Sequence, residues 1–204
     1  MSWVYEGVAT KHLDELDEND LQYLWLPLSH VFGKALIAVQ LAYGFASAVD
    51  GRIDKIVQGL GEVRPTFMCG APRIFEKVRG AVMTGNTGLK AKIARWAFSV
   101  GYESIDDRLA GRELKGALAV KYKIADKLVF SKLKERLGGR IRFMISGSAK
   151  LSPQVQRWFY GAGILIVEGY GATETSALAS LDLPEDPPFG SVGADMKPSG
   201  YDID

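Results

Sequence analysis

The apolar positions of this chain form short unbroken runs, separated by stretches with helical spacing. Short apolar runs are typical of strands in a parallel sheet, where helices cover both faces and no position faces water. They predict strands at Tyr23 to Ser29, Thr66 to Cys69, Arg140 to Ser146 and Ile164 to Val167.

Helical patterns fill the intervals between these runs. Predicted helices span Gly33 to Tyr43, Asp54 to Leu60 closed by Gly61, Arg73 to Met83, and Leu89 to Gly101. A long helix ending near Gly138-Gly139 is predicted from apolar residues spaced by three or four: Leu118, Tyr122, Ala125, Val129, Leu133 and Leu137. Alternating strands and helices predict an α/β fold with a parallel sheet flanked by helices.

The segment from Ile164 to Ala177 predicts a strand, a glycine turn around Tyr170, and the start of a helix. Unpaired amides and the dipole at a helix start favour an anion. A hydroxyl at Thr173 suits a phosphate, and a carboxylate at Glu174 suits Mg2+. The alternative is an ordinary strand-to-helix turn with a capping threonine. Neither a G-x-x-x-x-G-K-[ST] loop nor a G-x-G-x-x-G fingerprint is present, which disfavours two common nucleotide-binding classes.

Three candidate loops follow predicted strands, at His30, Gly147 and Tyr170. Ligands of open α/β sheets bind beyond the carboxyl ends of the strands. We therefore expect these loops to converge on one rim. Another helix is predicted to begin at Ser152, with a capping hydroxyl and Pro153 in its first turn.

Composition narrows the class of protein without selecting a function. The 204 residues are 47% hydrophobic with a net charge of +1, which fits a globular protein and gives no argument for nucleic-acid binding. A single cysteine, Cys69, excludes an internal disulfide and favours a reducing cytoplasm. The amino-terminal segment is too polar for a signal peptide, and no apolar run predicts a transmembrane helix.

Positive charge is concentrated between Arg112 and Arg142, where ten Lys or Arg face three acids. Lys123, Lys127 and Lys134 fall on a face of the long helix away from its apolar positions. This face suits contact with anionic lipid headgroups, and a solvated helix face is the alternative interpretation.

Four spaced motifs give the chain a family resemblance over essentially its whole length. YGATET after the last strand resembles the Tyr-Gly-x-Thr-Glu signature of the AMP-forming (adenylating) acyl-CoA synthetases. LPLSHVFG, GAPRIFEKV and SGSAKLS follow the same family in order, and the first two resemble its bacterial long-chain fatty acid branch.

The resemblance implies a set of site residues. Thr173 would bind phosphate, Glu174 would hold Mg2+, and His30 would position ligands in the acyl and AMP pocket. Nucleotide contacts are implied for Gly147, Ser148 and Ala149 in the adenine turn, for Tyr170 along the adenine, for Gly169 and Gly171 around it, and for Glu168 at the nucleotide edge.

It also implies a domain assignment and an activity. Residues 1–204 would be an incomplete central part of the N-terminal domain of an adenylate-forming enzyme, without the upstream phosphate loop or the C-terminal lysine domain. The activity implied is a long-chain fatty acid CoA ligase using ATP, Mg2+ and CoA, with the isolated chain inactive. We expect a cytoplasmic protein in contact with the inner face of the membrane.

Two alternatives remain. One is a non-catalytic nucleotide-binding or subunit protein that complements a partner fragment of the same enzyme. The other keeps adenylation with an aryl or amino acid as substrate.

Overall fold

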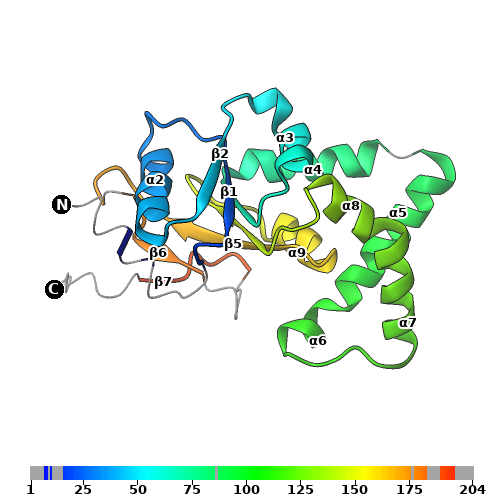
Figure 1. Cartoon of the computed structure of the whole chain (residues 1–204). Coiled ribbons are helices and arrows are strands. Elements are labelled where there is room, and N and C mark those ends of the chain that lie inside the picture. The colour runs from blue at the N-terminus through cyan, green and yellow to red at the C-terminus, as the bar shows by residue number, and fades with distance from the viewer. Residues whose placement is uncertain are drawn as a thin grey trace.

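In the computed structural model, residues 7–8, 10, 16–85, 87–175, 177–182 and 189–195 are described. Their strands form one seven-stranded sheet in the order β2-β1-β3-β4-β5-β6-β7 (Figure 1). The first five are mutually parallel, and β6 and β7 continue the sheet antiparallel. The strands are β1 (Leu21–Leu24), β2 (Ala46–Val49), β3 (Phe67–Gly70), β4 (Phe143–Ser146), β5 (Leu165–Tyr170), β6 (Ser180–Leu181) and β7 (Ala194–Asp195).

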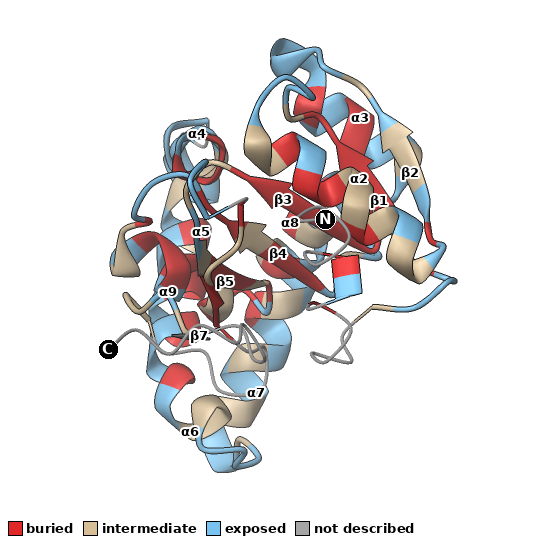
Figure 2. Cartoon of the chain, turned by 90° about the vertical axis from the view of Figure 1, so that its left-hand side faces the viewer, coloured by how far each residue is buried: buried red, intermediate tan, exposed pale blue. Residues whose placement is uncertain are grey.

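Helices cover both faces of the sheet, which confirms the predicted α/β fold. One face is covered by α2 (Val31–Tyr43), seen in front of the buried strands in Figure 2. The other face carries the main core and the remaining helices: η2 (Ile53–Lys55), α3 (Ile56–Val63), α4 (Pro72–Thr84), α5 (Gly88–Glu103), α6 (Ile105–Leu109), α7 (Gly116–Ala125), the π-helical η3 (Asp126–Phe130), α8 (Ser131–Arg136) and α9 (Pro153–Gly161). No helix in the described ranges has the length and apolarity to cross a bilayer.

Successive residues of each central strand enter different cores. In β3, Phe67 and Cys69 pack towards α2, whereas Met68 belongs to the core on the opposite face. Because side chains alternate across a strand, an unbroken apolar run is what two covered faces require. The same alternation decides which residues near the end of β5 can reach a ligand.

A helical lobe formed by α5 to α8 extends from the sheet (Figure 1). It joins α9 where Gly101 of α5 meets Gly161, since a Cβ added to Gly101 would lie 2.9 Å from the Gly161 carbonyl oxygen. Arg108 of α6 also donates to the Tyr160 carbonyl at 2.8 Å. The predicted long helix is present, but a π turn at η3 interrupts it and seats the buried Phe130 beside Phe98.

The amino-terminal ends of three strands are joined by one buried carboxylate. Asp20, just before β1, accepts hydrogen bonds from Arg142 before β4, at 2.7 Å, and from the Thr66 hydroxyl before β3. Burial alone would raise the pKa of Asp20, but these bonds and the Arg142 charge outweigh it and hold the pKa below its usual value. The ionised carboxylate therefore stabilises this edge of the sheet.

Several predicted boundaries were wrong for local reasons. Strand β1 ends at Leu24, whereas the prediction ended at Ser29. Strand β4 starts at Phe143, whereas the prediction started at Arg140. Gly61 does not close the third helix, which continues to Val63 and ends at Arg64 in the left-handed region, φ 54°. Ser152 precedes α9, but its hydroxyl makes no capping bond.

Candidate active site

A cavity of ≈ 280 Å³ lies between α2 and the sheet and opens at the carboxyl ends of the strands. Its deep part is lined by apolar side chains from α2 and from β3, β4 and β5, among them Leu36, Val39, Phe67, Cys69, Phe143, Ile145 and Val167. Its mouth is lined by small and polar residues: His30, Gly147, Ser148, Gly169, Tyr170, Gly171 and Thr173. The three predicted loops therefore converge on one rim, as expected from a parallel sheet.

His30 is placed at this rim because it begins α2. Its Nδ1 accepts a hydrogen bond from the Phe32 amide at 3.2 Å, so the side chain caps the helix. A neutral ring that accepts at Nδ1 carries its proton on Nε2. His30 can therefore present an N–H donor to a ligand in the cavity.

Gly147 and Ser148 form the turn at the end of β4. The Gly147 amide donates to the Gly70 carbonyl at 3.1 Å, and a Cβ at Gly147 would lie 3.1 Å from the ring of Phe32. Ser148 adopts φ 69°, a left-handed conformation that costs energy in a residue with a side chain and is common at functional sites. Ala149 follows as an exposed residue and is not among those that line the cavity.

Tyr170 ends β5 at the cavity mouth and is 55% exposed as a residue. Gly169 lies against Leu178 and Leu181, since a Cβ added there would be 3.1 Å from each of these side chains. Gly171 is more tightly constrained, because its Cβ would fall 1.4 Å from the Ala177 carbonyl oxygen. The loop after β5 can return across the cavity mouth only with glycine at this position.

The chain after Gly171 does not open a helix, so that prediction was wrong. Residues 173–175 form a turn, and the chain then pairs back on β5 as β6. Thr175 holds this loop, since its hydroxyl oxygen accepts from the Ala172 amide at 3.0 Å and lies 3.0 Å from the Ala172 carbonyl. Any phosphate contact here must come from side chains and loop amides, because no helix dipole is present.

Thr173 and Glu174 are neighbours within this turn but differ in their relation to the cavity. Thr173 is exposed and lines the cavity, so its hydroxyl is available to a ligand. Glu174 is also exposed but lies outside the lining residues. Its carboxylate has no hydrogen-bond partner among the described residues, and a hard oxygen donor of this kind suits Mg2+ that is shared with substrate phosphates.

Glu168 points away from the cavity, because it alternates with Val167 and Gly169 along β5. It is buried on the α9 face, where its Oε1 accepts from the Leu151 amide at 2.7 Å. Burial raises its pKa. Glu168 therefore lies behind the cavity and outside the residues that line it, and its contact with the nucleotide edge stays a prediction.

Asp182 was missed by the sequence interpretation. It is buried at the end of β6, it lines the cavity, and its Oδ2 accepts from the Glu168 amide at 3.2 Å. Burial raises its pKa to about 6. The only signal was alternating polarity from Ser180 to Asp182, which is too short to identify a strand.

Comparison with known proteins gives a consistent picture. Residues 1–202 match the AMP-binding enzyme family. Long chain acyl-CoA synthetase 8 of Arabidopsis thaliana is 36% identical over 204 residues, which cover 94% of this chain and 28% of the plant protein. The chain thus spans less than a third of the length of this relative.

Two solved structures share the fold at low sequence identity. The N-terminal domain of FACL13 from Mycobacterium tuberculosis matches with a TM-score of 0.62 and 17% identity, over 96% of this chain and 39% of that one. O-succinylbenzoate coenzyme A synthetase (MenE) from Bacillus subtilis, in complex with ATP and magnesium ion, matches with a TM-score of 0.60 and 14% identity, over 96% and 31%.

Proposed function

Because the chain belongs to the AMP-binding enzyme family, we propose that the full-length protein activates a long-chain fatty acid with ATP and transfers the acyl group to coenzyme A. The observation that carries this proposal is the two-part cavity. An apolar interior beneath α2 leads to a rim of glycines, hydroxyls and one histidine. An acyl chain with a carboxylate at its end has the same division of polarity.

The proposed reaction has two transfers. A carboxylate oxygen of the fatty acid attacks the α-phosphorus of ATP, the bond to the β-phosphate oxygen breaks, and pyrophosphate leaves with the electron pair. The sulfur of coenzyme A then attacks the acyl carbon of the acyl-adenylate, and its thiol proton is released. The bond between that carbon and the AMP phosphate oxygen breaks, so AMP leaves and the thioester remains. Both transfers require in-line positioning and compensation of phosphate charge, and neither requires a nucleophilic side chain.

Nucleotide binding is assigned to the turns after β4 and β5. Tyr170 offers an exposed ring on which adenine can stack, and the small residues Gly147 to Ala149 allow the base to approach the backbone. The hydroxyl of Thr173 would donate to a phosphate oxygen. The Nε2–H of His30 would hold the substrate carboxylate or the adenylate in position.

Glu174 is the residue assigned to magnesium. Its exposed carboxylate and its place beside Thr173 fit a metal held by few protein oxygens together with phosphates. When bound, the ion would neutralise charge on the phosphate oxygens. The likeness to MenE, whose structure holds ATP and magnesium ion, supports this assignment at the level of the fold.

The apolar lining of the cavity interior supports a fatty acid with a long acyl chain as the substrate, in preference to an aryl or amino acid. Aromatic and aliphatic side chains from three strands line the deep part of the cavity, while its polar groups lie at the mouth. An amino acid substrate would need a charged partner for its amine inside the pocket. Asp182 is the one acid among the described residues that line the cavity, and its Oδ2 is already engaged by the Glu168 amide.

The proposal is tested on the full-length protein by palmitate-dependent ATP–pyrophosphate exchange and by acyl-CoA formation. Replacing Glu174→Gln should lower exchange about 100-fold, since shape persists while the charge that offsets phosphate is lost. Glu62→Gln, an exposed acid on α3, is the matched control and should keep full exchange. Exchange supported by aryl or amino acids in place of palmitate would overturn the substrate assignment.

A further inference from the structure

The outer face of α7 and η3 carries a stripe of apolar side chains exposed to solvent. Val120, Ile124 and Leu128 are 59%, 46% and 44% exposed, and their spacing of four places them along one side of the helix. The opposite side packs inwards through Ala125 and Phe130. Single exposed apolar residues are ordinary, but an aligned row on an outlying helix is the pattern of a contact surface.

The π turn of η3 helps to keep this row straight. In a regular α-helix, residues four apart drift steadily around the axis. Each residue of a π turn advances less around the axis than an α-helical residue, because five residues separate its bonded groups. Leu128 lies within η3, so it stays closer to the line of Val120 and Ile124 than an uninterrupted α-helix would allow.

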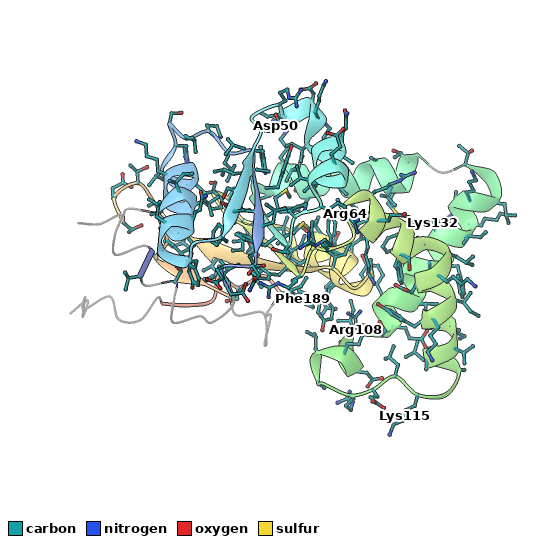
Figure 3. The ribbon with its side chains drawn as sticks, viewed as in Figure 1. Asp50, Arg64, Arg108, Lys115, Lys132 and Phe189 are labelled. Carbon is teal, nitrogen blue, oxygen red and sulfur yellow. The ribbon has the colours of Figure 1, made fainter. Side chains whose placement is uncertain are left out.

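Exposed lysines border the same row. Lys115, Lys121, Lys123, Lys127 and Lys132 are all exposed, and none has an ion-pair partner in the described part of the chain. Figure 3 marks Lys115 and Lys132 near the two ends of the segment. Lysine side chains can lie along apolar surface while their charged ends reach outwards.

Acidic groups are few here, and the most central one is already paired. Asp126 is the only acid between residues 115 and 132, and it accepts from Ser131 and from Lys134, each at 2.9 Å. Lys134, assigned to this face from the sequence, is therefore engaged within the lobe. Glu113 precedes the segment and Glu135 follows it.

We propose that this face of residues 115–132, the lobe face, rests on an anionic lipid bilayer. The apolar row enters the boundary between headgroups and acyl chains, and the five lysines contact lipid phosphates. An apolar row with cationic borders on a helix that lies along the surface is the pattern of an interfacial helix. An acidic protein surface would pair with the lysines but would leave the apolar row without apolar groups to contact. The proposal is independent of the proposed reaction, since α7 packs against α5 and contributes nothing to the cavity.

Vesicle sedimentation of the full-length protein tests the lobe face. The probes are vesicles of phosphatidylcholine alone and vesicles with one third phosphatidylglycerol. Ile124→Ser with Leu128→Ser removes the apolar row, and Lys123→Glu with Lys127→Glu reverses its border. Val57→Ser and Lys55→Glu are matched controls on α3 and η2, because Val57 is also 46% exposed and Lys55 is an exposed lysine.

We expect binding to the anionic vesicles only, weakening with added salt. Each lysine near the surface is worth about fivefold in partitioning, so the double reversal should lower binding by at least about 25-fold. The serine pair should lower it about tenfold or more, and both controls should bind like the wild type. Equal binding by the variants, or no binding by the wild type, would overturn the proposal. So would loss of a self-associated species in light scattering, since the face would then join two copies of the protein.

Discussion

The carboxylate of Glu168 accepts a hydrogen bond from the amide of Leu151, and this 2.7 Å contact joins β5 to the loop before α9. It lies directly behind Gly169, on the face of the sheet opposite the cavity. The residue that precedes the glycine motif therefore packs behind the cavity and is not among the residues that line it. This arrangement separates effects on folding from effects on nucleotide binding.

Replacing Glu168→Ala should destabilise the protein by about 1–3 kcal/mol, because the buried Leu151 amide loses its acceptor. Glu168→Gln keeps an acceptor oxygen and should cost less. Urea unfolding measures both changes. The nucleotide affinity of the folded variants, measured by calorimetry, should stay within about twofold of that of the wild type. A large loss of affinity without loss of stability would show that Glu168 contacts the nucleotide.

The stability of the protein should depend on pH through Asp182. Burial raises the pKa of its carboxyl to about 6 from 3.8, so folding favours the protonated acid. The stabilising contribution is complete below about pH 4 and is lost as pH rises through about 6. The free energy of unfolding of Asp182→Asn, relative to that of the wild type, should therefore rise by about 1–3 kcal/mol from pH 4 to pH 7. Unfolding measured across that pH range checks this. A flat difference across these pH values would contradict the assignment.

Gly171→Ala should reduce adenylation by at least about 100-fold, because the new methyl group would displace the Ala177 carbonyl and with it the loop across the cavity mouth. Acid-dependent pyrophosphate exchange by the full-length protein measures the effect. Gly80→Ala on α4 is the control, since a Cβ there meets open space and alanine favours a helix. Wild-type exchange by Gly171→Ala would show that the loop is free to move.

The contact between α5 and α9 gives a prediction about the lobe. Gly101→Ala should destabilise the protein by about 1–3 kcal/mol, since the added methyl group would press on the Gly161 backbone and separate the two helices. Thermal unfolding beside the same Gly80→Ala control measures this cost. Vesicle binding by the folded variant should persist, because the lobe face is untouched.

Arg142→Gln should cost about 3 kcal/mol near neutral pH, because Asp20 would remain ionised and buried without its charged partner. The pKa of Asp20 is lowered in the folded state, so its stabilisation is present above the unfolded value near pH 4 and fades as pH falls further. The penalty of the variant should shrink in the same acidic range. A penalty independent of pH would indicate lost packing instead.

Strands β3 and β5 could be predicted from the sequence because an unbroken apolar run marks each of them. The predicted strand Thr66 to Cys69 starts and ends within one residue of β3 (Phe67–Gly70). The predicted strand Ile164 to Val167 starts within one residue of β5 (Leu165–Tyr170). Convergence of His30, Gly147 and Tyr170 followed from parallel order alone. At these positions the local hydrophobic pattern matches the burial that a parallel sheet requires, so the strands could be predicted without knowledge of long-range contacts.

The region after Gly171 could not be predicted in this way. Thr175 bonds to the Ala172 backbone and closes a turn where a helix was expected, which is the usual competition of a hydroxyl with regular backbone pairing. Strands β6 and β7 have two residues each, too few to leave a periodic signal. The burial of Glu168 and Asp182 depends on contacts between residues 14 or more apart in the chain.

Asp20, Thr66 and Arg142 clasp the strands at the end remote from the cavity mouth. The lengths of β3 and β4 separate these three residues from the polar rim of the cavity, whereas Phe67 and Phe143 beside them line its apolar interior. Substitutions that raise thermal stability at this end of the sheet should therefore leave the nucleotide-facing rim unchanged, while those that reach Phe67 or Phe143 would also alter the apolar interior.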